Sequence, residues 1–586
     1  MLPDSRQSRI VVSRAFTAVT VAILAMLIWF SLRLAAMRIF QVDECGNVVV
    51  ARILANGQAR TTLGAIDLFQ IPLALLAKGA SRSIDIFVSA RFVMVELFWL
   101  NILLMTLATG ERLRSKGGLI AFAGAATLAP LWDYGFEIRH DNLLLTGILL
   151  MWCCIRLRPP SVHAYFITGA LSVALQFIAF KAFVYTIPIS AALLICPPPG
   201  TTTQGWKLAA GWVIGAVLTL GAVRWIYGAW GIWEIFTQGA RWLTGVSTSG
   251  QHRFAPWLTL ARLLGQAPLL LAFCAAGVIA LALQFARRRI AALSWEGTLP
   301  EFLLLTIALL ALAINPTPYP YNLLLVVPYA YLFAFRYART LSGEFRLQGA
   351  LAPLAASLLL FGHLAPFGMA TVRHVEFSNG RQEGLMRMAE NLTDPVRDPV
   401  YDGTGLVPTR RIVDPRAFLH SLTIAALSDG SGPRFRELMA SNPPAVVIPS
   451  YRTDGLPEKE WNYVDNHYVS LADDFRVLGK VLPPGGGEFE VIHAGRYRIS
   501  TLEGSDLAGT YPEGMKGLMT PENPGKLSGR LDGIDFADET VELTVGTHHL
   551  NCDSDTQPAI VWVGPRLKRI HRFASGDHQQ LFVNWY

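Results

Sequence analysis

The stretch that decides the fold is VVSRAFTAVTVAILAMLIWFSL at residues 11–32, followed by FQVDE at residues 40–44. The first segment is long enough to cross a bilayer, because about 20 helical residues at a rise of roughly 1.5 Å span the hydrocarbon layer. Two adjacent carboxylates, Asp43 and Glu44, therefore follow the point where a membrane helix emerges. Acids at helix ends are usually solvated, so a functional role for this pair depends on the rest of the chain.

The composition predicts a polytopic α-helical membrane protein. Hydrophobic residues make up 52% of the 586 residues, charged residues 16%, and the mean hydropathy is +0.37, which excludes an ordinary soluble enzyme. The net charge of +7 does not indicate nucleic-acid binding, because the basic residues fall in short loops between apolar runs. Six cysteines are too few for a disulfide scaffold in a chain of this length.

The apolar runs predict about eleven spans with a cytoplasmic N-terminus. Arg6 and Arg9 precede the first span and Arg14 lies near its start. The span has no clean cleavage site, which indicates an uncleaved anchor. Eleven spans put every short basic loop on the cytoplasmic side, as lysine and arginine bias requires. The expected spans are 11–32, 84–107, 118–131, 142–155, two within 165–196, 208–227, 257–285, 300–314, 323–335 and 349–369. Residues 48–55 and 66–78 are expected to lie in the interface.

Polar residues within these runs refine the topology. A single helix over 165–196 would leave Lys181 at the bilayer centre, at a cost of about 2.5 to 3.5 kcal/mol, so we predict a hairpin with Lys181 at its outer turn. Arg91 and Glu96 lie inside the second span and are expected to pack or to pair with other polar groups.

After about residue 372 the composition becomes that of a soluble region. Short strands at 400–401 and 445–448, with helices at 415–427 and 434–439, predict an α/β lobe. Gly403-Thr404-Gly405 is only a fragment of a dinucleotide-binding fingerprint, and its spacing disfavours that function. Beyond a Pro/Gly linker, the β-rich segments 488–493, 496–500, 540–544 and 559–563 predict a sandwich-like domain, with glycan binding left open. The expected domains are a transmembrane domain at 1–371, a periplasmic α/β lobe at 372–482 and a periplasmic β-rich domain at 483–586.

The outer side gathers the groups that a transferase using a lipid-phosphate-linked donor requires. Such an enzyme needs a carboxylate to take a proton from an acceptor hydroxyl, cations or polar donors to hold the leaving phosphate, and a cavity beside the lipid. Asp43 and Glu44 can supply the first. The candidates for the second are Lys181, Arg139, His140, and Tyr319 or Tyr321.

Each of these groups also has a structural alternative. Lys181 could be a lysine that snorkels to the headgroups, Glu137, Arg139 and Asp141 could form an exposed ion-pair cluster, and the tyrosine loop could belong to an interfacial aromatic belt. Their convergence on one leaflet favours the functional interpretation.

Together, the acids after the first span, a second acidic cluster ending in Asp141, a hairpin lysine and a Pro/Tyr-rich loop resemble the GT-C membrane glycosyltransferases. The protein O-mannosyltransferases and the lipid A aminoarabinose transferases are the most similar members, and the resemblance covers about residues 1–369. It implies that Asp43 is the catalytic base, that Asp141 is the second acid of the outer cavity and that Lys181 is the family's lysine. Gln70 stands where the family often has a basic residue for the donor phosphate, so Arg60, Lys78 or Arg139 would have to supply that charge.

The sequence thus predicts a glycosyltransferase of the bacterial inner membrane. It would move a sugar from undecaprenyl phosphate or a similar polyprenyl carrier to a lipid, polysaccharide or protein acceptor on the periplasmic face. Asp43 would activate the acceptor hydroxyl, Glu44 or Asp141 would orient it, and Lys181 with Arg139 would stabilise the leaving phosphate. The resemblance also implies inversion and, commonly, independence of metals, although a divalent metal stays open.

Two other functions remain in view. A flippase or transporter of lipid-linked sugars should carry ionisable groups near mid-membrane and often repeats its two halves, whereas here the charges gather at one interface and no repeat is found. A non-catalytic scaffold of the cell envelope would need no acid pairs near lipid. The sequence does not specify the sugar, the acceptor or the oligomeric state.

Overall fold

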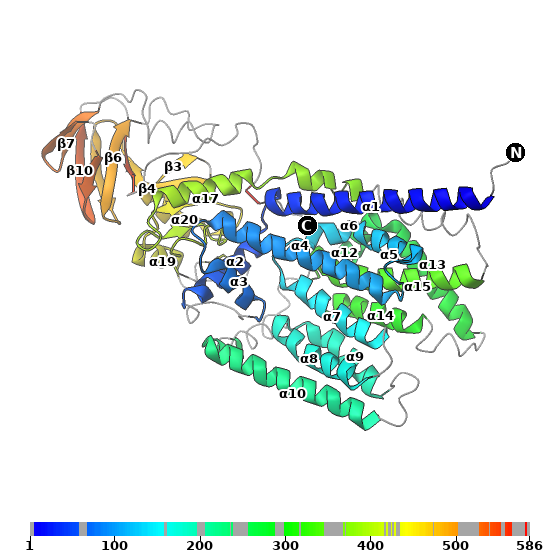
Figure 1. The fold of residues 1–586 in the computed structure, drawn as a ribbon. Coiled ribbons are helices and arrows are strands. Elements are labelled where there is room, and N and C mark those ends of the chain that lie inside the picture. Colours follow the sequence, from blue (N-terminus) through cyan, green and yellow to red (C-terminus); the bar gives the residue numbers. More distant parts are fainter. Residues whose placement is uncertain are drawn as a thin grey trace.

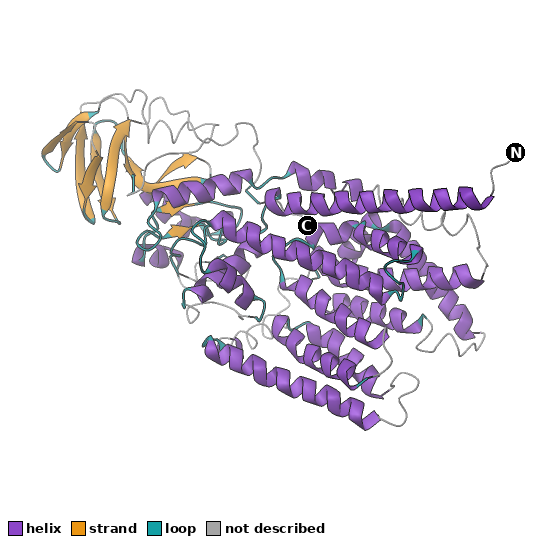
Figure 2. Ribbon diagram, viewed as in Figure 1, coloured by secondary structure: helices purple, strands orange, loops and turns teal. Residues whose placement is uncertain are grey.

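The structure is a computed structural model, in which a helical bundle is joined at one end to a region containing the described strands (Figures 1 and 2). We call that region the extramembrane lobe. The described residues are 5–57, 67–156, 161–195, 205–234, 236–237, 256–286, 298–315, 318–344, 367–369, 371–414, 418–419, 423–424, 427–428, 430, 434–472, 474–501, 527–537, 540–552, 557–564 and 581–582.

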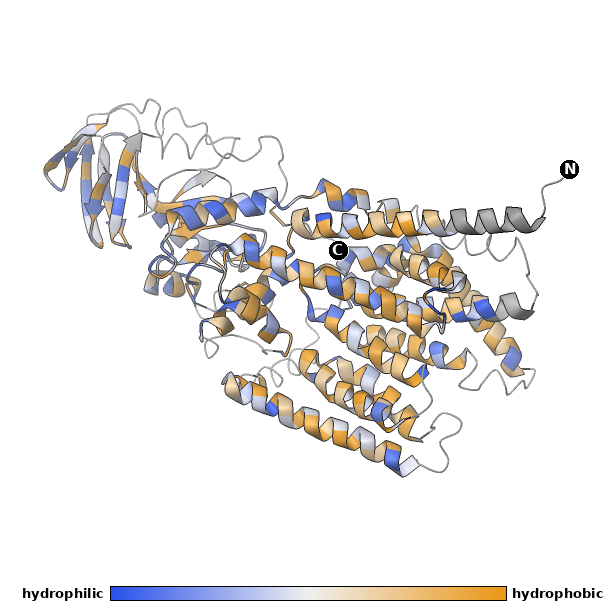
Figure 3. Cartoon of the chain, in the orientation of Figure 1, coloured by the Kyte–Doolittle hydropathy of each residue, from blue (hydrophilic) through white to orange (hydrophobic). Residues whose placement is uncertain are grey.

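Within the described residues, four helices are long and apolar enough to cross a membrane. They comprise residues 17–37 of α1 (Ser5–Met37), and α4 (Ser83–Ala108), α10 (Gly205–Ala229) and α13 (Pro268–Ala286). Shorter helices complete the bundle: α5 (Lys116–Ala126), α7 (His140–Arg156), α8 (Val162–Ile178), α9 (Ala182–Ile195), α14 (Leu299–Ile314) and α15 (Val327–Glu344). The bundle helices are mostly apolar (Figure 3). Trp206 and Trp225 of α10 are 72% and 74% exposed, as expected for a lipid-facing helix.

The predicted hairpin around Lys181 is present. Helices α8 and α9 are antiparallel, because Tyr165 Oη donates to the carbonyl of Leu193 at 3.1 Å and the hydroxyls of Ser172 and Ser190 lie 2.9 Å apart. The short turn between the two helices contains Lys181. The cost of a lysine at the bilayer centre therefore predicts the turn where the structure has it.

Three expected spans have different boundaries. The segment 257–285 is divided into α12 (Pro256–Gln266) and α13, because Pro268 has no N–H to continue the α12 hydrogen bonds. The segment 118–131 is divided into α5 and α6 (Ala129–Tyr134), and 323–335 begins within the 3-10 helix η3 (Pro320–Leu325). Most of the span expected at 349–369 lies outside the described residues, so the number of spans stays a prediction.

Residues 42–55 form a single helix, α2 (Val42–Ala55), which starts earlier than expected. The Gln41 backbone N–H donates to Glu44 Oε2 at 2.8 Å, and this contact satisfies a donor at the helix start. Asp43 and Glu44 thus lie in the first turn of α2, where the helix dipole favours negative charge. Helix α3 (Gln70–Ala77) packs against α2.

Within the described residues, the extramembrane lobe contains two sheets. The larger has the order β1-β2-β4-β11-β6-β9, with β3 paired to β4, and the smaller has the order β5-β10-β7-β8. The strands are β1 (Val400–Tyr401), β2 (Val446–Val447), β3 (Tyr468–Ala472), β4 (Phe475–Val481), β5 (Gly486–Val491), β6 (Gly495–Thr501), β7 (Ser528–Leu531), β8 (Ile534–Ala537), β9 (Thr540–Leu543), β10 (Gly546–Cys552) and β11 (Pro558–Trp562). Strands β1 and β2 are parallel and the other pairs are antiparallel.

The expected strands of the lobe are found, but hydrogen bonding crosses the expected domain boundary. Strand β4 ends at Val481 and pairs with β11, so one sheet includes strands from both sides of residue 482. The division into two extramembrane domains stays a prediction. The lobe also contains α17 (Gly380–Leu392), α19 (Phe435–Ser441) and α20 (Glu458–His467), whereas much of the helix expected at 415–427 lies outside the described residues.

The lobe packs directly on α2 and α3 (Figure 1). Buried side chains of α2 and of the lobe belong to one hydrophobic cluster. The Gln382 side chain of α17 accepts a hydrogen bond from the Phe40 N–H at 2.7 Å and donates to the Phe40 carbonyl at 2.9 Å. The turn between α1 and α2 is therefore held by the lobe, and α2 lies between the bundle and the lobe.

Candidate active site

Four charged side chains form a continuous series of ion pairs at the end of the bundle that faces the lobe. Asp43 comes from α2, Arg139 immediately precedes α7, Asp141 lies in the first turn of α7, and Lys181 lies in the α8–α9 turn. Arg139 pairs with Asp43 through Nη1, and its Nε lies 3.2 Å from Asp141 Oδ2. Lys181 Nζ pairs with Asp141 Oδ1. We call these four residues the open cluster.

The four members of the open cluster differ strongly in exposure. The side chain of Asp43 is 44% exposed and that of Lys181 26%, whereas Arg139 is 7% and Asp141 0% exposed. A buried ion is tolerated when opposite charges contact it, and Asp141 meets this condition through Arg139 and Lys181. Asp43 is therefore the acid that a solute can reach, and Asp141 is the acid that holds the two cations.

The Pro/Tyr-rich loop contributes an aromatic wall to the cluster. The guanidinium carbon of Arg139 lies 3.6 Å from the ring centroid of Tyr321, and Lys181 Nζ lies 5.6 Å from it. Lys181 also donates to Asn322 Oδ1 at 3.4 Å. The ring of Tyr319 is 5.8 Å from that of Tyr321. The structure thus places the Tyr321 ring against both cations, with the Tyr319 ring next to it, and adds Asn322, which was not expected from the sequence.

His140 links the open cluster to a further acid, Asp67. Its Nδ1 lies 3.7 Å from Asp67 Oδ2 and its Nε2 lies 3.8 Å from Asp141 Oδ1. Burial raises the pKa of Asp67 to about 8, against the opposing effect of backbone N–H groups. Asp67 is therefore mostly protonated at neutral pH. From the sequence, Asp67 was expected only as part of an interfacial segment, although an acid within an apolar run was a usable signal.

Glu44 is enclosed, in contrast to its neighbour Asp43. Arg91 of α4 donates to both Glu44 oxygens, at 2.8 Å from Nε and 2.6 Å from Nη2. The Ile138 N–H donates to Glu44 Oε1 at 3.1 Å, and Glu44 is 0% exposed. The expectation that Glu44 touches the acceptor does not fit this position. The expectation that Arg91 pairs with a polar group is confirmed.

Gln70 belongs to the support of the site and not to the series of ion pairs. Its Nε2 donates to Asn47 Oδ1 at 2.8 Å, and Asn47 Nδ2 donates to the carbonyl of Ile138 at 2.8 Å. Gln70 is only 4% exposed. It therefore connects α3 through α2 to the segment that precedes Arg139, so contact with a donor phosphate does not follow from its position.

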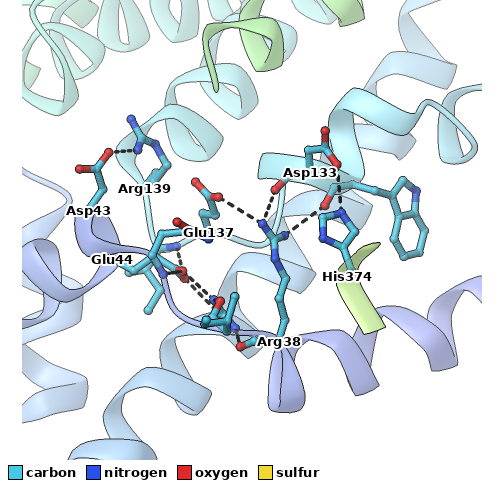
Figure 4. Close-up of polar contacts among 12 residues, drawn as sticks. Arg38, Asp43, Glu44, Asp133, Glu137, Arg139 and His374 are labelled. Atoms are coloured by element: carbon cyan, nitrogen blue, oxygen red, sulfur yellow. Dashed lines mark hydrogen bonds and ion pairs between the residues drawn. The ribbon is translucent and has the colours of Figure 1, made fainter. Parts of the chain in front are cut away.

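A second cluster of charged and polar groups lies beside the first. It comprises Arg38, Asp133, Glu137, Arg262, Gln266 and His374, and we call it the closed cluster. Arg38 Nη2 lies 3.2 Å from Glu137 Oε1, and the Asp133 carboxylate accepts hydrogen bonds from His374 Nε2 at 3.0 Å and from Gln266 Nε2 at 2.5 Å. Figure 4 shows Glu137 between Arg139 and Arg38. Sequence reasoning missed most of this cluster because its members come from distant segments with no shared motif.

The open cluster has the chemical groups for proton transfer and anion binding. An exposed carboxylate can accept a proton from a hydroxyl, while a guanidinium and an ammonium can form charge-assisted hydrogen bonds to phosphate oxygens. Within the described part of the chain, no group of three or more His, Cys, Asp and Glu side chains is placed to hold a metal ion.

No family model matches the chain, and no curated protein matches it in sequence. Solved structures of similar architecture include ArnT from Cupriavidus metallidurans bound to undecaprenyl phosphate, with a TM-score of 0.49, 13% identity, and coverage of 79% of this chain and 98% of that one. The Archaeoglobus fulgidus oligosaccharyltransferase in complex with Zn and sulfate has a TM-score of 0.43 and 12% identity, covering 91% and 96% of the two chains. Both are GT-C glycosyltransferases, and ArnT is a lipid A aminoarabinose transferase.

Proposed function

We propose that this protein is an inverting membrane glycosyltransferase that moves a sugar from a polyprenyl-phosphate donor to an acceptor hydroxyl. Transfer would take place at the lobe-facing end of the bundle, which we assign to the periplasmic side of a bacterial inner membrane. The observation that carries the proposal is the open cluster, in which residues from three distant segments of the chain join an exposed acid to two cations. This is the combination that acceptor activation and phosphate departure require.

Asp43 is proposed as the general base. As the acceptor oxygen bonds to the anomeric carbon of the sugar, its proton moves to an Asp43 carboxylate oxygen, and the bond from that carbon to the donor phosphate breaks. Arg139 holds the Asp43 carboxylate in one orientation. The first turn of α2 is fixed in turn by the buried pair of Glu44 and Arg91, so the base is held on a rigid element.

Lys181 and Arg139 are proposed to hold the leaving phosphate. Its negative charge increases as the bond to the sugar breaks, and preorganised cations stabilise such a charge. Asp141 forms ion pairs with both cations and so positions them. Phe183 and Ile187, which follow Lys181 on α9, are 49% and 61% exposed. An isoprenoid chain in the bilayer could therefore lie against α9 while its phosphate contacts Lys181.

The test uses the full-length protein in lipid nanodiscs with radiolabelled undecaprenyl-phosphate sugars and bacterial cell-envelope membranes as the acceptor source. A transferase releases undecaprenyl phosphate and moves the label to the membranes, and Asp43→Asn should abolish both events. Asp85→Asn is the matched control, because Asp85 is also paired with an arginine, Arg82, and is 42% exposed. Label that only crosses the bilayer of proteoliposomes would indicate a flippase, and absence of both activities would indicate a scaffold.

A further inference from the structure

The carboxyl edge of the parallel pair β1–β2 faces α2. Because the two strands are parallel, the loops that follow them, 402–407 and 448–453, leave the sheet at the same edge. The first loop lies against α2, since a Cβ added to Gly405 would be 3.0 Å from the carbonyl oxygen of Cys45. In open α/β sheets the carboxyl ends of the strands are where ligands bind. The second loop therefore emerges beside the helix that carries Asp43.

The second loop presents an aromatic ring and a guanidinium on a rigid turn. Thr453 Oγ1 donates to the Ser450 carbonyl at 2.6 Å and accepts from the Ser450 N–H at 2.8 Å. Tyr451, between them, is 49% exposed. Arg452 Nε donates to Tyr451 Oη at 3.2 Å, and the ring of Phe582 packs edge-on at 6.2 Å. The ring is thus held in place while much of it stays accessible.

Tyr451 also lies within electrostatic range of the proposed base. Burial raises the pKa of the Tyr451 hydroxyl, Arg452 lowers it, and the carboxylate of Asp43 raises it further. The packing agrees, because a Cβ added to Gly46, three residues after Asp43, would be 3.1 Å from the ring of Phe418 in the lobe. The lobe therefore approaches α2 at its first turns.

We propose that Tyr451 and Arg452 form a subsite for a saccharide acceptor, whose ring stacks on Tyr451 while one of its hydroxyls reaches Asp43. This proposal rests on the proposed transferase function and specifies the class of acceptor. An exposed aromatic face covers the C–H face of a sugar ring, and the guanidinium supplies donors to its oxygens. The subsite belongs to the lobe, and the phosphate-holding cations belong to the bundle. Donor and acceptor would therefore meet from opposite sides at Asp43.

The strand pairing favours a saccharide over a peptide. A peptide that extends a sheet needs a strand with unpaired main-chain groups. Strand β2 lies between β1 and β4, and β1 makes a further bridge from Val400 to Ile412. Both strands at this edge therefore have partners on two sides. A ligand at this edge therefore contacts side chains and not free main-chain groups. The side chains present, Tyr451 and Arg452, are of the type that binds sugars.

The experiment measures transfer from a radiolabelled undecaprenyl-phosphate sugar while cell-envelope membranes are titrated as the acceptor source. Tyr451→Ala should raise the apparent KM for acceptor about 10-fold, with little change in kcat or in binding of undecaprenyl phosphate. Tyr451→Trp, which keeps a stacking face, should recover most of the lost affinity. The control is Trp461→Ala on α20, where Arg476 lies 5.1 Å from the ring in a comparable pair, and it should behave as wild type.

Unchanged acceptor KM in Tyr451→Ala, with transfer still abolished by Asp43→Asn, would overturn the subsite and leave the transferase intact. Absence of any Asp43-dependent transfer would instead refute the proposed function. A photo-crosslinking amino acid at position 451 in whole cells adds a readout independent of kinetics. An adduct that contains periodate-oxidisable carbohydrate is expected, and an adduct that consists of peptide without carbohydrate would overturn the proposal. Retained binding of undecaprenyl phosphate shows that each variant is folded.

Discussion

The open and closed clusters lie side by side and are built from the same residue types, yet they differ in access. In the open cluster, Asp43 exposes 44% of its side chain. In the closed cluster, Arg38, Glu137 and His374 are each 2% exposed or less, Asp133 is 5% exposed, and the side chain of Arg262 is 18% exposed. Glu137 connects the two, since it pairs with Arg38 and lies beside Arg139 (Figure 4).

This difference separates two uses of buried charge. In both clusters, opposite charges offset the cost of burying ions. Ionic pairing alone therefore does not identify a functional site. The open cluster has a reachable carboxylate next to partly exposed cations, whereas the closed cluster uses its groups to join α1, α6, α12 and the segment around His374. We therefore assign the reaction to the first cluster and structural support to the second.

The largest expected effect is on catalysis at the exposed acid. Asp43→Asn should lower kcat for sugar transfer by about 10³-fold, because general-base catalysis typically contributes 10²- to 10⁴-fold. The thermal stability of the variant should match wild type within error, since the residue is exposed. Transfer is measured with the radiolabelled donor, and Asp85→Asn supplies the control. Activity within threefold of wild type would remove Asp43 as the base.

A large effect on stability is expected at the adjacent acid. Glu44→Ala would leave Arg91 buried without its carboxylate, at a cost of about 3 to 5 kcal/mol. We expect a marked fall in the thermal unfolding temperature and in the yield of folded protein, measured by size-exclusion chromatography after heating. Reversed results, with Glu44→Ala stable and Asp43→Asn unfolded, would invert the comparison between exposed and enclosed acids.

An intermediate effect is expected on donor affinity. Lys181→Gln removes a charge from the phosphate-holding pair and should weaken binding of undecaprenyl phosphate about 10- to 100-fold, because charge-assisted hydrogen bonds contribute roughly 1.5 to 3 kcal/mol. Binding is measured by microscale thermophoresis in nanodiscs. Asp43→Asn, by contrast, should bind the lipid at least as well as wild type. Equal affinity in wild type and Lys181→Gln would place the phosphate elsewhere.

A smaller effect is expected in the closed cluster. His374→Gln keeps a hydrogen-bond donor for Asp133 and should destabilise the protein by only about 1 kcal/mol. We expect kcat and KM for transfer to stay within threefold of wild type when equal amounts of folded protein are compared. A loss of transfer without a loss of stability would show that the closed cluster takes part in the reaction.

A pH dependence of stability is expected at Asp67. Burial raises its pKa from the ordinary 3.8 to about 8. Between these values the folded state binds more protons than the unfolded state, so the free energy of unfolding falls as pH rises. Asp67→Asn removes this linkage, and its unfolding temperature relative to wild type should therefore increase from pH 5 to pH 8. A difference that does not change with pH would show that Asp67 is not buried as a neutral acid.

Sequence reasoning was most successful where a cost was large and local. The penalty for an intramembrane lysine located the α8–α9 turn, and apolar length located most bundle helices. It failed where a single residue such as Pro268 interrupts a helix, and where two adjacent residues of the same type have different surroundings. Asp43 and Glu44 are adjacent and acidic, so the sequence assigned them one shared role. The rotation of about 100° per residue in a helix points them to different surroundings.

The sequence by itself determined the membrane class of the chain, the hairpin around Lys181 and the presence of charged groups near the ends of apolar runs. These features depend on the free-energy cost of placing a charge in the hydrocarbon layer, and that cost is the same whatever the tertiary structure. Only the tertiary structure decided which charges meet. Glu44 pairs with Arg91, Asp43 pairs with Arg139, and the packing of the lobe on α2 brings Tyr451 within electrostatic range of Asp43. Contacts of this kind join segments separated by up to hundreds of residues, and their specificity comes from packing and geometry that no local pattern encodes.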